Sequence, residues 1–290
     1  YAEARKWCLK AYESRHNLSR KERLSVESGY AMNFETPNEV IKIHRQLLEI
    51  DDKASVSLYL IGLYYNMIDQ YEKAIPELEK ALEINKKWGS QILWVPSYTV
   101  LGEAYHKTGQ FRKEHRLYKK AEKVFPDDIQ IIYRQAILAL TRGKTKQAEE
   151  YLARFESIAR NLGASEASIQ NELGYIYAEG GKLEKAEEHY RNALVLEPQS
   201  PVRMNNLAYL LIEKELNLDE GMELVEKALE LRPDISSFLH TKGLGLYKQG
   251  KYREALEVLQ KSWDLRMEFA GYSHEIFTDL EKAKKAVAKL

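Results

Sequence analysis

The stretch Asn171–Pro198, NELGYIYAEGGKLEKAEEHYRNALVLEP, decides how this chain folds. Two short segments with apolar and small residues at helical spacing flank Gly180-Gly181, and Pro198 ends the second segment. The residues that set the spacing are Leu173, Gly174 and Tyr177 in the first segment and Ala186, Tyr190 and Ala193 in the second. Two helices of this length cannot bury their apolar faces alone, so the pattern predicts that similar pairs pack beside them.

A small residue recurs along the chain at the point where the two helices of a pair must come close. Its positions, 34, 40, 34, 38, 34 and 35 residues apart, are Ser28, Gly62, Gly102, Ala136, Gly174, Ala208 and Gly243. The matching position in the second helix is small in most copies, although Val40 and Glu114 break the rule. An irregular helical bundle has no reason to keep a period, so this register favours a repeat array.

These residues and a period of about 34 residues resemble the tetratricopeptide repeat, and the arrangement is similar to a bacterial-type array of that family. The resemblance implies an all-α fold, a right-handed superhelix (an α-α solenoid) of about seven helix-turn-helix repeats with a C-terminal capping helix. We expect a single solenoid over residues 1–290. Its expected parts are a half repeat at 1–18, repeats at about 21–54, 55–88, 95–128, 129–162, 167–200, 201–235 and 236–269, and a cap at 272–290.

Two intervals are longer than the others, and both contain inserted residues. The first insertion carries Trp88 and Trp94, and the second is Gly163–Glu166. The two indole rings either staple lengthened helices together or form an exposed aromatic ledge for a partner. Near the start of the chain, Ser19 with Glu22 three residues later predicts a helix that begins with a capping box.

The charge balance argues against a role that depends on a basic surface. Lys plus Arg and Asp plus Glu are both 44, whereas proteins that neutralise nucleic-acid phosphates carry a basic excess. We therefore expect no nucleic-acid partner, with a basic patch inside the neutral total as the alternative. The lysines of the last segment are expected to form the polar outer face of the cap.

The single cysteine, Cys8, excludes an intramolecular disulfide framework, and we expect its thiol to be buried. No run approaches the roughly 18 apolar residues of a membrane span, and no signal peptide opens the sequence. Because the sequence begins at Tyr1 rather than Met, we expect it to be a piece of a longer chain. A cytoplasmic location is favoured, and neither the compartment nor the oligomeric state follows from the sequence.

Signatures of catalysis are missing from the sequence. The seven histidines form no HExxH pair, and no GxSxG, Walker A or kinase signature occurs. Gly243 and Gly245 lie inside a predicted helix and not after a strand, so they do not form a phosphate-binding loop. We therefore expect no metal, no cofactor and no enzymatic activity.

The resemblance implies that the first helix of each repeat lines a concave groove. The predicted groove residues are Tyr59, Leu63, Asn66, Glu103, Tyr133, Ile137, Asn171, Tyr175, Asn205, Tyr209, His240 and Leu244. Tyrosines offer contact area with a polar tip, and asparagines can bond an extended peptide backbone. For each residue, the alternative is that it fills space between adjacent repeats.

The resemblance implies a non-catalytic scaffold that binds a peptide or protein segment in this groove. The alternative is a regulatory or sensory region of a larger bacterial signalling or transcription-regulatory protein. One subclass of the family binds chaperone C-terminal carboxylates with a clamp of lysines, arginine and asparagines. Asn205 and Asn206 are present here, but the matching lysine pair is missing, so binding of chaperone tails is not implied.

Overall fold

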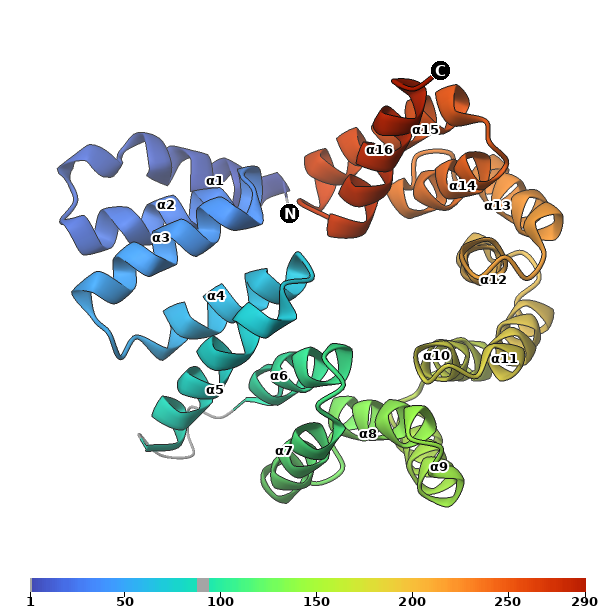
Figure 1. Ribbon diagram of the computed structural model, residues 1–290, viewed down its shortest axis with the longest axis horizontal. Helices are drawn as coiled ribbons and strands as arrows, with labels where there is room; N and C mark the ends of the chain where they lie inside the picture. Colours follow the sequence, from blue (N-terminus) through green and yellow to red (C-terminus); the bar gives the residue numbers. More distant parts are fainter. Residues whose placement is uncertain (1, 88–93) are drawn as a thin grey trace. The chain divides into compact units, whose positions relative to one another are not determined.

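The computed structural model describes residues 2–87 and 94–290, and these form sixteen α-helices, one short 3-10 helix and no strand (Figure 1). The predicted all-α fold is therefore confirmed. Contacts divide the chain into two compact units. The first unit holds the described residues up to Pro126 together with residues 267–274, and the second holds residues 127–266 and 275–290. A single solenoid over the whole chain stays a prediction.

Helices of the first unit pack in consecutive pairs. α2 packs on α3, α4 on α5 and α6 on α7, and α1 lies against α2. Their bounds are α1 Ala2–Glu13, α2 Arg20–Phe34, α3 Pro37–Ile50, α4 Ser55–Met67, α5 Tyr71–Lys87, α6 Val95–Lys107 and α7 Phe111–Val124, with the 3-10 helix at Arg15–Asn17. Ser19 and Glu22 form the predicted capping box at the start of α2.

Helices of the second unit follow the same scheme. α8 packs on α9, α10 on α11 and α12 on α13, and the first helices α8, α10, α12 and α14 also contact one another in turn. The bounds are α8 Ile129–Thr141, α9 Thr145–Asn161, α10 Glu166–Glu179, α11 Leu183–Leu196, α12 Pro201–Glu213, α13 Leu218–Leu231, α14 Ser236–Lys248, α15 Tyr252–Phe269 and α16 His274–Val287. The first helices therefore form a row.

The small residues mark the closest approach within a pair. A Cβ atom built on Gly174 in α10 would lie 2.7 Å from a ring carbon of Tyr190 in α11. A Cβ on Gly243 in α14 would lie 2.6 Å from Cγ of Leu259 in α15. Side chains at these positions would push the paired helices apart, which explains why the sequence keeps them small.

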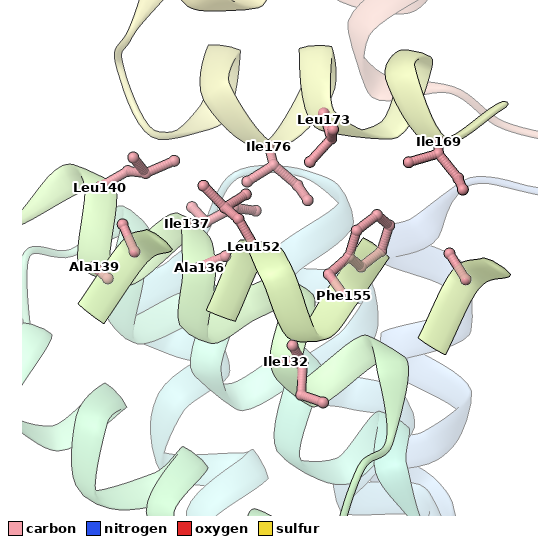
Figure 2. Close-up of a cluster of buried hydrophobic side chains, with 12 residues drawn as sticks. Ile132, Ala136, Ile137, Ala139, Leu140, Leu152, Phe155, Ile169, Leu173 and Ile176 are labelled. Carbon is pink, nitrogen blue, oxygen red and sulfur yellow. The ribbon is translucent and has the colours of Figure 1, made fainter. Parts of the chain in front are cut away.

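Apolar side chains from three successive helices share one core. One buried cluster takes Ile132 and Leu140 from α8, Leu152 and Phe155 from α9, and Ile169 from α10, and Figure 2 labels these side chains. These side chains are 0–8% exposed. The pair α8–α9 therefore does not bury its apolar face alone, and α10 of the next pair completes the core.

The second insertion lengthens a helix. We expected extra residues at Gly163–Glu166 between two repeats, but α9 has 17 residues whereas α11 and α13 each have 14. The connector from α9 to α10 is as short as those that follow α11 and α13. The extra length is close to one helical turn, because a turn takes about 3.6 residues.

Polar side chains are buried at two of the closest contacts. His44 is 4% exposed, its Nε2 lies 2.8 Å from Oγ of Ser28, and its Nδ1 lies 3.1 Å from Oγ of Ser57. Glu114 is 1% exposed and lies 3.0 Å from Nδ1 of His106. These hydrogen bonds satisfy groups that would otherwise be costly to bury.

Cys8 departs from the prediction. Its side chain is half-buried, and its Sγ lies 3.6 Å from Nδ2 of Asn33 in α2. The thiol is therefore less buried than the sequence predicted. One face of α1 packs on α2, and this leaves the thiol at the edge of that contact.

The last helix buries one face. In α16, Leu280 is 1% exposed and Ala283 is fully buried, and both belong to a cluster with Leu259 of α15. Lys284 and Lys285 of the same helix are exposed. α16 therefore has the apolar inner face and the polar outer face of a cap.

Replacement of Gly174 should test the close contact in the α10–α11 pair. Gly174→Ala should lower the free energy of unfolding by about 1–3 kcal/mol, because overlap with the Tyr190 ring outweighs the gain in helix propensity. Gly29→Ala is the matched control, since a Cβ there meets its nearest atom, Sγ of Cys8, at 4.0 Å. Denaturant unfolding measures both variants. Equal stability of the two would contradict the contact.

His44 should make stability depend on pH. Burial lowers its pKa from 6.5 to about 4, so the unfolded chain binds more protons between those values. The contribution of His44 to the free energy of unfolding is complete above pH 6.5. It is lost as the pH falls towards 4, by up to roughly 3 kcal/mol. Denaturant unfolding of the parent and of His44→Gln across this range should show a weaker pH dependence in the variant. Parallel curves for the two proteins would refute the assignment.

Truncation of a buried side chain of α16 should test its role as a cap. Leu280→Ala should cost about 2–4 kcal/mol, because it leaves a cavity against α15. Lys285→Ala on the exposed face is the control and should change the free energy of unfolding by less than about 0.5 kcal/mol. A Leu280→Ala variant as stable as the parent would show that α16 does not support the array.

Candidate interaction surface

In the first unit, two predicted groove residues fill space between helices. Tyr59 is 9% exposed, and burial raises the pKa of its hydroxyl. Asn66 is also 9% exposed and donates a hydrogen bond from Nδ2 to the carbonyl oxygen of Val100, 2.8 Å away, which joins α4 to α6. Leu63 and Glu103 are half-buried. For Tyr59 and Asn66, packing between repeats is the better interpretation.

The predicted aromatic ledge is described only in part. Trp94 is 49% exposed, and its ring centroid lies 5.1 Å from that of Tyr59. Trp88 lies outside the described residues. The ledge therefore stays a prediction.

In the second unit, Tyr133 of α8 and Tyr175 of α10 form a stacked pair. Their ring centroids are 6.1 Å apart and their planes differ by 25°. Tyr133 is half-buried, and its ring lies 6.0 Å from that of Phe155 in the core. Tyr175 is 45% exposed. The pair thus presents one accessible ring supported by an anchored one.

Two carboxylates lie one helical turn on either side of Tyr175. Glu172 precedes it by three residues and Glu179 follows it by four, so all three side chains share one face of α10. Burial, the neighbouring Tyr175 and these carboxylates raise the pKa of Tyr133, while the guanidinium of Arg134 opposes the shift. Neither glutamate was among the predicted groove residues, although their spacing from Tyr175 places them on the same helix face.

A pocket of about 340 Å³ opens beside the tyrosine pair. Tyr133 and Glu172 line it, and Phe155, Leu162 and Ile169 supply apolar surface. Leu162 follows the lengthened end of α9 and is 71% exposed. The pocket was not predicted, because the extra residues were expected to form a separate insertion and not a longer helix.

Asn171 and Asn205 are not placed to grip a peptide. Each is 7% exposed. The Oδ1 atom of Asn171 accepts a hydrogen bond from Nδ2 of Asn206, 2.7 Å away, which joins α10 to α12. Burial at the contact between first helices is therefore the better interpretation of both residues.

Ile137 and His240 need a similar correction. Ile137 is 2% exposed and belongs to the core shared by α8, α9 and α10 (Figure 2). His240 is 4% exposed, and its Nε2 lies 3.0 Å from Oδ2 of Asp279 in α16. Burial would raise the pKa of Asp279, but hydrogen bonds from His240 and Lys282 lower it. Neither predicted groove residue is free to touch a partner.

Tyr209 is also engaged within the chain. Its hydroxyl donates a hydrogen bond to the carboxylate of Glu275 in α16, and its ring centroid lies 6.3 Å from that of His240. Burial and then the charge of Glu275 raise the pKa of Tyr209. Leu244 is half-buried and lines a separate pocket with Lys282. α16 therefore occupies the end of the row of first helices.

Two kinds of site find no support in the described residues. Within residues 2–87 and 94–290, no group of three or more His, Cys, Asp or Glu side chains is placed to hold a metal ion. Across the same part of the chain, none of the helices has the length and apolar character that a membrane crossing needs. The candidate site is the surface built by Tyr133, Tyr175 and the adjacent pocket, because it combines an accessible ring with a cavity.

Known proteins share the repeat. The sequence pattern of the tetratricopeptide repeat matches residues 56–87 and residues 133–201. The mouse protein "Cell division cycle protein 16 homolog" is 23% identical over 245 residues, which are 73% of this chain and 39% of that protein. The human protein "Protein O-mannosyl-transferase TMTC1" is 24% identical over 218 residues, 71% of this chain and 23% of that protein. This chain thus spans less than half the length of both relatives.

A solved structure is similar over most of the chain. A chain in the crystal structure of the APC/C hetero-tetramer Cut9-Hcn1 matches with a TM-score of 0.48 and 15% identity, covering 97% of this chain and 52% of that chain. The O-mannosyl-transferase activity in the name of the human relative is stated of that relative alone. Relatives of similar identity come from animals, a bacterium and an archaeon, so a bacterial type stays a prediction.

Three findings agree on the family. The sequence pattern matches in both units, the helices pack in consecutive pairs, and small residues mark the contact within those pairs. The chain therefore contains tetratricopeptide repeats, which the family pattern matches at residues 56–87 and 133–201.

Proposed function

We propose that this protein is a non-catalytic interaction scaffold that binds a peptide or a protein segment on α8 and α10 of the second unit. The observation that carries the proposal is the stacked pair Tyr133–Tyr175, with its accessible ring beside a pocket of about 340 Å³. A pocket of this size can hold a large apolar side chain of a partner.

The tyrosine pair has the properties of a binding hot spot. Tyr175 gives contact area with little loss of rotamer freedom, Tyr133 stacks against it, and Phe155 in turn contacts Tyr133. The exposed side chain of Leu162 adds apolar surface at the pocket, which a bound segment would remove from water. The bound segment can be extended or helical.

The proposal narrows the groove expected from the sequence. Asn171, Asn205, Ile137 and His240 are 2–7% exposed, so we assign them to packing. Tyr209 is held by Glu275. The binding surface we propose is therefore short and lies on the first two helix pairs of the second unit.

Loss of the exposed side chains should abolish binding without unfolding the chain. The parent chain should capture a partner from a lysate of the source organism, with the amount measured by mass spectrometry. The double variant Tyr175→Ala with Leu162→Ala should retain at least about tenfold less of that partner than the parent does. Circular dichroism and the melting temperature should stay nearly unchanged, because the two side chains are 45% and 71% exposed.

A matched control removes two exposed apolar side chains elsewhere in the second unit. Val195 and Leu231, which are 77% and 47% exposed, lie on α11 and α13. Val195→Ala with Leu231→Ala should leave capture intact. If this control loses the partner while the Tyr175 and Leu162 variant keeps it, the binding surface lies on the second helices.

A further inference from the structure

The surface around Tyr175 carries negative charge on both sides of an aromatic ring. Glu172 and Glu179 are seven residues apart on α10, which places them about 10 Å apart along the helix axis with Tyr175 between them. Glu172 is exposed and makes no ion pair with any side chain in the described part of the chain. A cation above Tyr175 would therefore lie within reach of a carboxylate in either direction along the helix.

The accessible ring is itself suited to a cation. The face of a tyrosine ring attracts ammonium and guanidinium groups that come within about 6 Å of its centre. Tyr133 stacks against Tyr175, so the second ring keeps the first in place and leaves it 45% exposed. An aromatic face next to two carboxylates favours a cation more than either group does alone.

The neighbouring helices α8 and α12 also carry charged side chains. Arg134 of α8 lies near the pair, with its guanidinium carbon 6.0 Å from the centroid of the Tyr133 ring, and it opposes the carboxylates. On α12, the half-buried carboxylate of Glu213 pairs with Lys214, and its charge acts on Tyr209. Arg134 also lines the pocket, and Glu179 already has an interaction within the chain, so Glu172 is the carboxylate that a bound cation meets without a competing partner among the described residues.

We propose that the segment bound here is basic: a lysine or arginine side chain docks on Tyr175 between Glu172 and Glu179, and a neighbouring apolar side chain enters the pocket. Tyr133 and Glu172 line the pocket and also belong to the charged aromatic surface, so the two subsites are continuous. This inference rests on the proposed function and adds the chemistry of the partner. An acidic segment would instead meet the two carboxylates and be repelled.

Selection of a displayed library of random peptides of about 12 residues on the full chain should test the inference. Lys or Arg near Leu, Ile or Phe should be enriched in the retained peptides. In fluorescence polarisation, the enriched peptides should bind the double variant Glu172→Gln with Glu179→Gln at least about tenfold more weakly than they bind the parent chain. Their affinity should also fall as salt is raised from about 50 to about 300 mM.

The matched control removes two carboxylates from another helix. Glu184→Gln with Glu188→Gln changes two exposed side chains of α11 and should leave peptide affinity unchanged. The inference would be overturned if the enriched peptides lacked basic residues and bound the Glu172 and Glu179 variant as tightly as the parent. If those peptides still failed to bind the Tyr175→Ala variant, the proposed function would stand. If no peptide is enriched, or if the enriched peptides bind the Tyr175→Ala variant as tightly as the parent, both the inference and the proposed function are wrong.

Discussion

The closest approach of two helices at one small residue is the constraint on which the structure depends. Where Gly174 meets Tyr190 and Gly243 meets Leu259, there is no room for another carbon atom. A fixed point of contact sets the angle and spacing of each pair, and the next pair can then complete the core, as α10 does for α8 and α9. The regular period of the sequence follows from this, because every pair needs the same close contact.

The sequence was sufficient to predict what depends on neighbours along the chain. Helical spacing, the Ser19–Glu22 capping box and the positions of the small residues are local patterns, and they led to the all-α repeat fold. Exposure on the first helices depends instead on the adjacent pair. Asn171 and Ile137 have the spacing of groove residues, but α12 covers the first and the shared core takes in the second.

Contacts between residues far apart in sequence decided the rest of the site. Glu275 and Asp279 of α16 bind Tyr209 and His240, which are 66 and 39 residues away along the chain. Helical periodicity cannot reveal such pairs, since it relates residues only within one helix. The same limit explains why Tyr133 and Tyr175 were each predicted but their stacking was not, and why the pocket beside them was missed.

The lengthened α9 shows how such an array can change its specificity. With 17 residues where its neighbours have 14, it extends by about one turn, close to 5 Å, and its far end shapes the pocket beside Tyr133. The contacts at the small residues are untouched, so the residues that hold a pair together and those that shape the proposed binding surface lie at separate places. Related arrays can thus diverge in what they recognise through insertions and deletions at helix ends, and a comparison restricted to aligned repeat positions would overlook that divergence.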